Sequence, residues 1–224
     1  MITNVRNRPS FRPLLPSLTE AWLESAIDPV LWSWVNPVGG TAWAPGIHTT
    51  GHRMVWSRPD ASNNCQLWAN IATTISPVKT RQDAIVQVAT FEFELKLSNV
   101  ANIDTTSFFL GLVASSLIAG RTRLADDIIG WGLFSDALQS VTNESGVETV
   151  NTGFGETLTN FNKLKVELSY GHAKFFINER QVADHTTNLS ALIFMPSFYM
   201  ATEAGGNATI YLGTNRAWME DLLR

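Results

Sequence analysis

Alternation of apolar and charged residues is the clearest pattern in the chain. Between positions 91 and 97 every second residue is apolar, and Glu92, Glu94 and Lys96 stand between them. A period of two is typical of a β-strand with one buried face and one solvated face. We therefore predict an amphipathic strand here.

Residues 164–179 predict a β-hairpin. Apolar and charged residues alternate as far as Leu168, Gly171 follows in the turn, and a second run rich in β-formers ends at Asn178-Glu179. Such a pattern favours two antiparallel strands joined by a short turn.

Further strands are predicted by short apolar runs and by the turn residues between them. Residues 108–114 and 128–134 are apolar on both faces, as in the middle of a sandwich, and later strands are expected at residues 181–185, 193–202 and 209–212. Short strands separated by Gly and Pro turns indicate an all-β sandwich of two antiparallel sheets rather than βαβ units.

The N-terminal region has a different character. Its prolines predict an extended arm as far as Pro16, and Ser17 with Glu20 three positions later forms a capping-box start for one short helix that ends at Pro29. The predicted division is an arm and short helix over residues 1–27 and a sandwich domain over residues 28–224.

Composition excludes several classes of protein. The 224 residues carry a net charge of -4, which argues against nucleic-acid binding because phosphate neutralisation needs a basic surface. Cys65 is the only cysteine, so no intrachain disulfide can form. The chain shows no signal-peptide pattern and no apolar run long enough to span a bilayer, so we expect a protein made in the cytoplasm without a membrane partner.

Several segments in this order resemble the concanavalin A-like lectin and glucanase superfamily, which includes laminin-G-like modules. They are Asp28-Pro29-Val30-Leu31-Trp32 before a Gly-rich turn, the strand at 91–97, Gly130-Trp131-Gly132-Leu133-Phe134, and the hairpin that ends at 175–182. The resemblance implies a jelly roll of two stacked antiparallel sheets, one of them concave. It also implies that ligands lie on the concave face or at its rim loops.

Hydrolases of this superfamily carry three spaced carboxylates on one strand, Glu-x-Asp-x-(x)-Glu, because glycoside cleavage needs an acid and a second carboxylate facing one sugar. The strands at 108–114 and 128–134 contain no such triplet. Glu92 and Glu94 are expected to form a solvated strand face that pairs with Lys163, Lys165 and Glu167. The sequence-based expectation is therefore a protein that is not an enzyme.

Aromatic side chains are the candidates for glycan binding, because their faces can stack on a sugar ring. Trp131 is the first choice because Gly130 and Gly132 flank it; the alternative is a core residue. Trp43 and Trp56 are further candidates.

Calcium is considered because many members of the superfamily bind it through rim loops. Asp126, Asp127 and Asp136 bracket the strand of Trp131 and supply the hard oxygen ligands that calcium prefers. The alternative is that they are solvated loop acids, and no other cofactor is expected.

Arg6, Arg8 and Arg12 give the arm a basic cluster that could dock on a neighbouring subunit. We expect a homo-oligomer and a non-catalytic jelly-roll structural or adhesion protein, as in a bacteriophage virion component that decorates the capsid or tail at the virion surface. The alternative is a lectin-like carbohydrate-binding module, with or without calcium, that binds a cell-surface glycan. A glycoside hydrolase ranks third.

Overall fold

The computed structural model of the chain describes residues 18–20, 32–35, 46–48, 53–58, 64–69, 85–97, 106–113, 127–134, 137–169, 171–189, 195–202 and 208–223. These residues form strands and their connections, and no helix occurs among them. No helix in this part of the chain is long and apolar enough to cross a membrane.

The strands of the described residues are β1 (Leu18–Glu20), β2 (Trp32–Val35), β3 (Gly46–His48), β4 (Arg53–Arg58), β5 (Asn64–Ala69), β6 (Ile85–Leu97), β7 (Thr106–Val113), β8 (Ile128–Phe134), β9 (Ala137–Glu144), β10 (Val147–Asn151), β11 (Asn162–Ser169), β12 (His172–Ile177), β13 (Arg180–His185), β14 (Met195–Thr202) and β15 (Ala208–Leu223).

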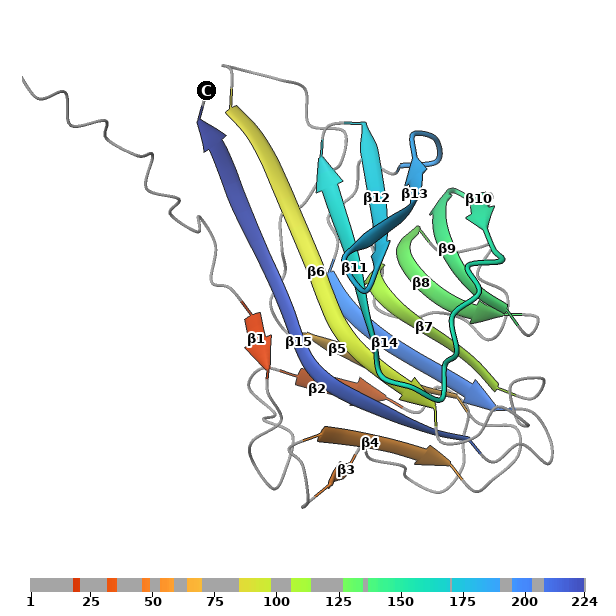
Figure 1. Cartoon of the computed structure of the whole chain (residues 1–224). Coiled ribbons are helices and arrows are strands. Elements are labelled where there is room, and N and C mark those ends of the chain that lie inside the picture. The colour runs from red at the N-terminus through yellow and green to blue at the C-terminus, as the bar shows by residue number, and fades with distance from the viewer. Residues whose placement is uncertain are drawn as a thin grey trace, which may run out of the picture.

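The strands form two sheets that stack on each other (Figure 1). Sheet A has the order β13-β12-β11-β6-β15-β4-β3, with β1 also paired to β15, and sheet B has the order β10-β9-β8-β7-β14-β5-β2. Neighbouring strands in the described sheets run antiparallel, as in β6 with β11 and β7 with β8. This architecture confirms the predicted all-β sandwich.

The core lies between the sheets and is made of the apolar residues that alternate along the strands. Phe91, Phe93 and Leu95 of β6 are buried, and the charged residues between them are partly exposed. From sheet B, the ring of Trp131 meets the ring of Phe175 of sheet A edge-on, with 5.4 Å between centroids. The period of two seen in the sequence thus separates core from solvent, as predicted.

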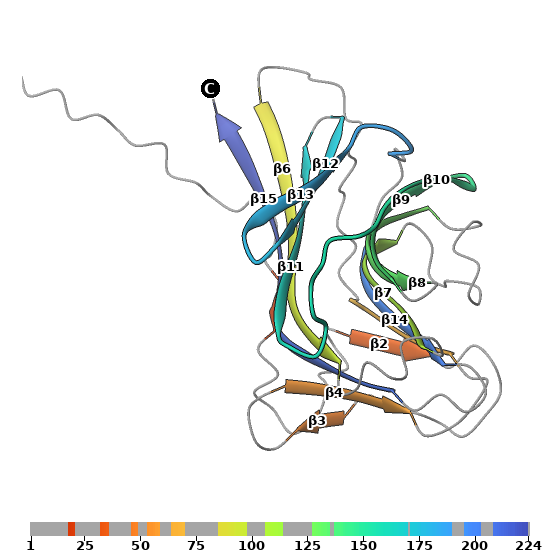
Figure 2. The same cartoon turned by 45° about the vertical axis from the view of Figure 1, so that its right-hand side comes forward.

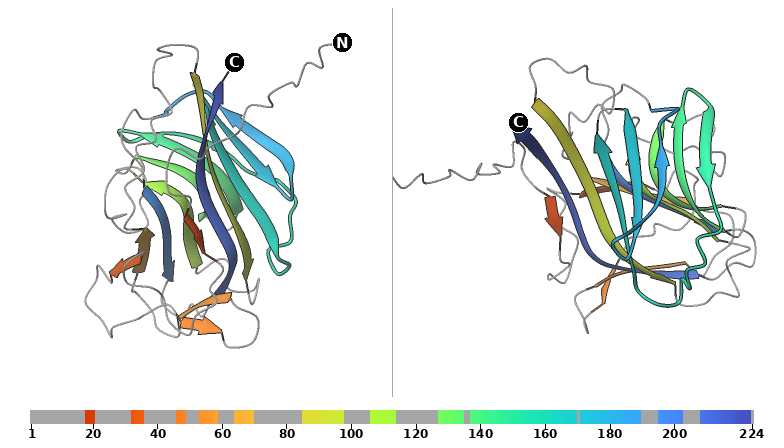
Figure 3. Two further views of the ribbon diagram at one scale, coloured as in Figure 1. Left: turned by 90° about the vertical axis from the view of Figure 1, so that its left-hand side faces the viewer. Right: turned by 45° about the horizontal axis from the view of Figure 1, so that its top comes forward.

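Sheet B is bent, and the face turned away from sheet A is concave (Figure 2). The same curvature is visible in β8 and β9 when the molecule is turned (Figure 3). We call this outer surface of sheet B the concave face. A concave sheet is what the resemblance to the superfamily implied.

One predicted element is wrong and one is too short. Leu18–Glu20, at the start of the predicted helix, form β1, which pairs with Asn215–Ala217 of β15. Pairing with a long edge outweighs the local helix signal, since short segments take the structure of the neighbours they contact. In addition, β15 extends to Leu223, well beyond the strand predicted at 209–212.

The hairpin predicted at residues 164–179 is confirmed as β11 and β12, paired from Leu164↔Ile177 to Ser169↔His172. Gly171 has a φ of 70° in its turn, in the left-handed region that glycine adopts without steric cost. At the other end of β12, Asn178 and Glu179 have φ values of 49° and 67°.

Candidate functional site

The centre of the described concave face is built around two facing glycines. Gly111 of β7 and Gly130 of β8 are direct partners in the ladder. A Cβ added to either would lie 2.8 Å from Cζ of Phe109, and one on Gly130 would lie 2.7 Å from Cα of Gly111. The Phe109 ring therefore covers both glycines, and no larger residue fits at either position.

Around these glycines the concave face is apolar and buried. Phe109, Val113, Ile128 and Val141 form one cluster, each at most 1% exposed, and Val150 of β10 packs against it. The positions of β8 on this face are Ile128, Gly130, Gly132 and Phe134 by strand alternation. This strand therefore presents no carboxylate to the concave face.

The other half of the concave face carries polar and aromatic positions. Ser197 and Tyr199 of β14 are partners of Gly111 and Phe109, so they belong to the same face. Across the next ladder, Ser197 pairs with Trp68 and Tyr199 with Gln66. The register thus places two aromatic positions and one amide position of β5 and β14 on the same face, although these strands are far apart in sequence.

Trp131 lies in the core and not on a binding surface. It is fully buried, its Nε1 donates a hydrogen bond to the Lys165 carbonyl at 3.2 Å, and its ring meets Phe154 and Phe175 edge-on. Alternation along β8 puts Gly130 and Gly132 on the opposite face, so they do not uncover its ring. The structure corrects the prediction that Trp131 stacks on a sugar.

The other predicted site residues lie apart or outside the described residues. Asp127 accepts a hydrogen bond from the Ser145 backbone N–H at 2.7 Å and so holds the β9–β10 turn. Trp56 belongs to β4 of sheet A, away from the concave face. The predicted site residues that lie outside the described part of the chain are Trp43, Asp126, Asp136, Arg6, Arg8 and Arg12.

Among the described side chains no group of three or more His, Cys, Asp or Glu residues could hold a metal ion. Calcium binding through Asp126 and Asp136 stays a prediction, because neither residue is described.

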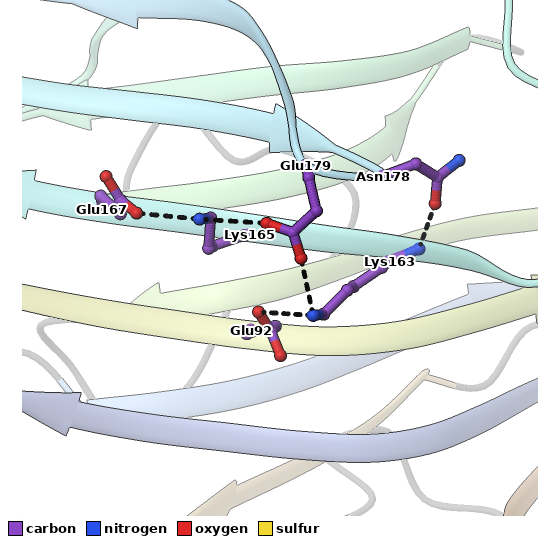
Figure 4. A network of polar contacts seen from close by, with 6 residues as sticks. All are labelled: Glu92, Lys163, Lys165, Glu167, Asn178 and Glu179. Atoms are coloured by element: carbon purple, nitrogen blue, oxygen red, sulfur yellow. Dashed lines mark hydrogen bonds and ion pairs between the residues drawn. The ribbon is translucent and has the colours of Figure 1, made fainter.

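The outer face of sheet A carries a network of ion pairs (Figure 4). Lys163 Nζ lies 3.2 Å from Glu92 and 2.8 Å from Glu179, and Lys165 Nζ lies 2.9 Å from Glu167. The hydrogen bond to Glu179 raises the pKa of Lys163 and lowers the pKa of that glutamate. The pairing of the Glu92 face with these lysines confirms the prediction, and these acids are occupied in holding the sheet surface together.

A buried polar network that the sequence did not reveal joins the two sheets at one edge. His185 of β13 lies 3.1 Å from Ser140 Oγ through Nε2 and 3.0 Å from Thr142 Oγ1 through Nδ1. The Thr142 hydroxyl donates to the Thr187 carbonyl, so Nδ1–H donates to Thr142 and Nε2 accepts from Ser140. Burial lowers the pKa of His185 to about 4, against a smaller raising effect of Asp184, so the imidazole is neutral.

No protein-family profile matches the sequence, and no curated protein matches it. Solved structures do match. The β-glucanase of Bacillus licheniformis is 13% identical with a TM-score of 0.61, and the match covers 90% of this chain and 97% of that one. The catalytic domain of an endo-1,3-β-glucanase (laminarinase) from Thermotoga petrophila is 9% identical with a TM-score of 0.61, over 93% and 97% of the chains.

An alginate lyase is 7% identical with a TM-score of 0.55, over 80% of this chain and 78% of that one. The chain has the concanavalin A-like jelly-roll fold. This confirms the resemblance inferred from the order of its strands.

The comparisons correct the expected function. The sequence predicts a non-catalytic phage structural protein that is not an enzyme, but structures that share this fold along nine-tenths of the chain include a β-glucanase and a laminarinase. The prediction that the chain is not an enzyme rests on the missing carboxylate triplet in the strands at 108–114 and 128–134 and on the pairing of Glu92 and Glu94 with lysines. A few strands are too narrow a basis, because catalytic groups can come from any strand or loop around a concave face.

Proposed function

We propose that the protein is a carbohydrate-active enzyme that cleaves a polysaccharide bound across the concave face of sheet B. The supporting observation is the fold shared over nine-tenths of the chain with two glucanases, together with the concave seven-stranded sheet. Seven strands spaced by about 4.8 Å span roughly 30 Å, which is long enough for several sugar units of an extended chain.

The half of the concave face formed by β5 and β14 is the favoured binding region. It combines the positions of Trp68 and Tyr199 with those of Gln66 and Ser197. Aromatic rings stack on sugar faces, and amides and hydroxyls bond sugar hydroxyls. The β7–β8 half is apolar and buried, so it offers no exposed polar group to a sugar.

Two kinds of cleavage are compatible with the fold and differ in what they require. Hydrolysis needs two carboxylates about 5–10 Å apart, and β8 presents none to this face. β-Elimination from a uronic acid needs a base and a proton donor, which a tyrosine can supply. The products therefore decide the reaction class.

The test incubates the full chain with a panel of neutral and uronic-acid polysaccharides. New reducing ends without ultraviolet absorbance report hydrolysis, and reducing ends with absorbance of an unsaturated sugar report elimination. We expect one polymer to be shortened. Neither product nor retention on any polymer would contradict the proposal.

Two tyrosines provide a matched pair of variants that localises the activity. Tyr199 is on the concave face, and Tyr211, opposite Lys96, is on the outer face of sheet A. Tyr199→Ala is expected to lower kcat/KM by about tenfold, equivalent to about 1.4 kcal/mol. Tyr211→Ala should leave it within twofold, and equal losses in the two variants would remove the concave face from the proposal.

A further inference from the structure

A groove lies where β10 at the edge of sheet B meets β13 at the edge of sheet A. Its volume is about 550 Å³, within the range of small-ligand sites. One wall is the end of β10 and the segment after it, including Asn151, Thr152 and Phe154, and the other is the start of β13, including Arg180 and Gln181. Figure 3 shows β13 beside β9 and β10 at this edge.

The groove is bounded by contacts that fix its two walls. On one side, Thr149 of β10 bonds Thr187 at 2.8 Å and accepts from Asn188 at 2.9 Å, which ties the sheet edges together. On the other side, Arg180 Nη2 donates to Glu156 Oε1 at 2.9 Å. The walls therefore keep their separation without a ligand, which lowers the cost of binding one.

Two backbone features shape the walls. In β13 the register shifts, because Phe175 pairs with Ala183 and Phe176 with Gln181. Val182 is therefore an extra residue, a bulge in the wall of the groove. In the opposite wall, Gly153 and Gly155 have φ values of 79° and 76° on either side of Phe154. A Cβ on either glycine would meet nothing, so conformation and not space requires glycine there.

The chemistry of the walls suits a sugar. Phe154 is half-buried and its ring lies at 74° to that of Trp131, with 5.4 Å between centroids, so it contributes an apolar surface to the groove. Asn151, Thr152 and Gln181 are exposed and offer amide and hydroxyl groups. Arg180 donates to Glu156 through Nη2, and its guanidinium has further N–H donors. The Arg180–Glu156 pair carries no net charge.

We infer that this groove is a second glycan-binding site, which holds a neutral sugar unit of the polysaccharide outside the cleavage region. The inference rests on the proposed function for its ligand class. Neutrality follows from the charge balance of Arg180 and Glu156, because a uronic acid would have to compete with Glu156 for the guanidinium. Such a site anchors a long polymer and raises its effective concentration at the concave face.

The test uses the double variant Asn151→Ala, Gln181→Ala in the full chain. Both side chains are exposed, so folding should be unaffected, and thermal unfolding checks this. The matched control is Asn160→Ala, Thr186→Ala, two exposed polar residues outside the groove. Affinity electrophoresis in gels containing laminarin, lichenan or alginate measures retention, and cleavage of the polymer and of a short oligosaccharide is measured separately.

We expect a neutral polymer to retain the wild type and the control, with the groove variant losing retention at least fivefold. KM for the polymer should rise while cleavage of the short oligosaccharide stays unchanged. Retention and polymer KM equal to those of wild type would overturn the second site and leave the proposed function intact. Alginate retained in preference to the neutral polymers would overturn it too, and absence of both retention and cleavage would overturn both proposals.

Discussion

The close approach of Gly111 and Gly130 makes the concave face sensitive to a single methyl group. In Gly130→Ala the new Cβ would meet the Gly111 backbone and the Phe109 ring at less than 3 Å. Because backbone and ring would both have to move, we expect a loss of about 1–3 kcal/mol in the free energy of unfolding. Chemical denaturation measures this loss.

Gly155→Ala is the control for that variant. Its Cβ meets nothing, so its only cost is the left-handed φ of 76°, about 1 kcal/mol. If Gly130→Ala were no more destabilising than Gly155→Ala, the packing of Phe109 over the glycine pair would be wrong.

The buried His185 makes stability depend on pH. Its pKa is about 4 in the folded protein, against an ordinary value of 6.5, so the unfolded chain takes up the proton first as the pH falls. The contribution of neutral His185 to the free energy of unfolding is complete above pH 6.5 and is lost as the pH falls through 4. At about 1.4 kcal/mol per pH unit, the total is about 3 kcal/mol. Unfolding measured at a series of pH values should show this slope.

His185→Gln should flatten that slope, because it removes the buried imidazole. A slope that persists in the His185 variant would assign the pH dependence to other groups.

At the scale of an element, the turn between β12 and β13 combines an unfavourable backbone conformation with favourable ion pairs. Asn178 fits its left-handed φ, since its Oδ1 accepts the Lys163 N–H at 2.9 Å and its Nδ2 donates to Asn162. Glu179 has a φ of 67° without such a local bond, but its carboxylate pairs with Lys163 and Lys165. Glycine at position 179 would remove the steric cost of the left-handed φ, and it would also remove the ion pairs with Lys163 and Lys165.

We expect Glu179→Gly to raise the thermal midpoint, and to raise it more at high salt. Salt screens the exposed ion pairs of the wild type but does not change the backbone cost of a non-glycine residue. Glu179→Gln keeps the backbone cost and loses the charge, so it should lie below wild type at low salt and match it at high salt. If the rise of the thermal midpoint in Glu179→Gly became smaller as salt is added, the ion pairs would not be what offsets the backbone cost at this residue.

Strands with strict alternation or a continuous apolar run were predictable from sequence, as β6, β8 and the β11–β12 hairpin show. The extension of β15 was not, because residues such as Arg216, Glu220 and Asp221 give it no apolar face, and its pairing with β6 is long-range. The β9–β10 hairpin was missed for a similar reason: it is rich in polar residues such as Ser140 and Thr142, which are buried through contacts with His185.

At the scale of the whole molecule, the proposed location of the site on the concave face follows from the resemblance, but the residues proposed for it do not. Trp131 was chosen for its flanking glycines, yet alternation along a single strand does not say which face is the core. Ser197 pairs with Trp68, and Tyr199 with Gln66, only through the ladder of β5 and β14, a pairing of distant segments that no local pattern encodes.

The proposed function requires that the polysaccharide lies across the concave face of sheet B. Hydroxyl-radical footprinting of the full chain with and without a polysaccharide that it retains tests this most directly, because it reads Trp68 and Tyr199 on one face and Tyr211 on the other. We predict slower modification of Trp68 and Tyr199 with the polymer bound, and no change at Tyr211. Protection of Tyr211 with Trp68 and Tyr199 unchanged would contradict the account.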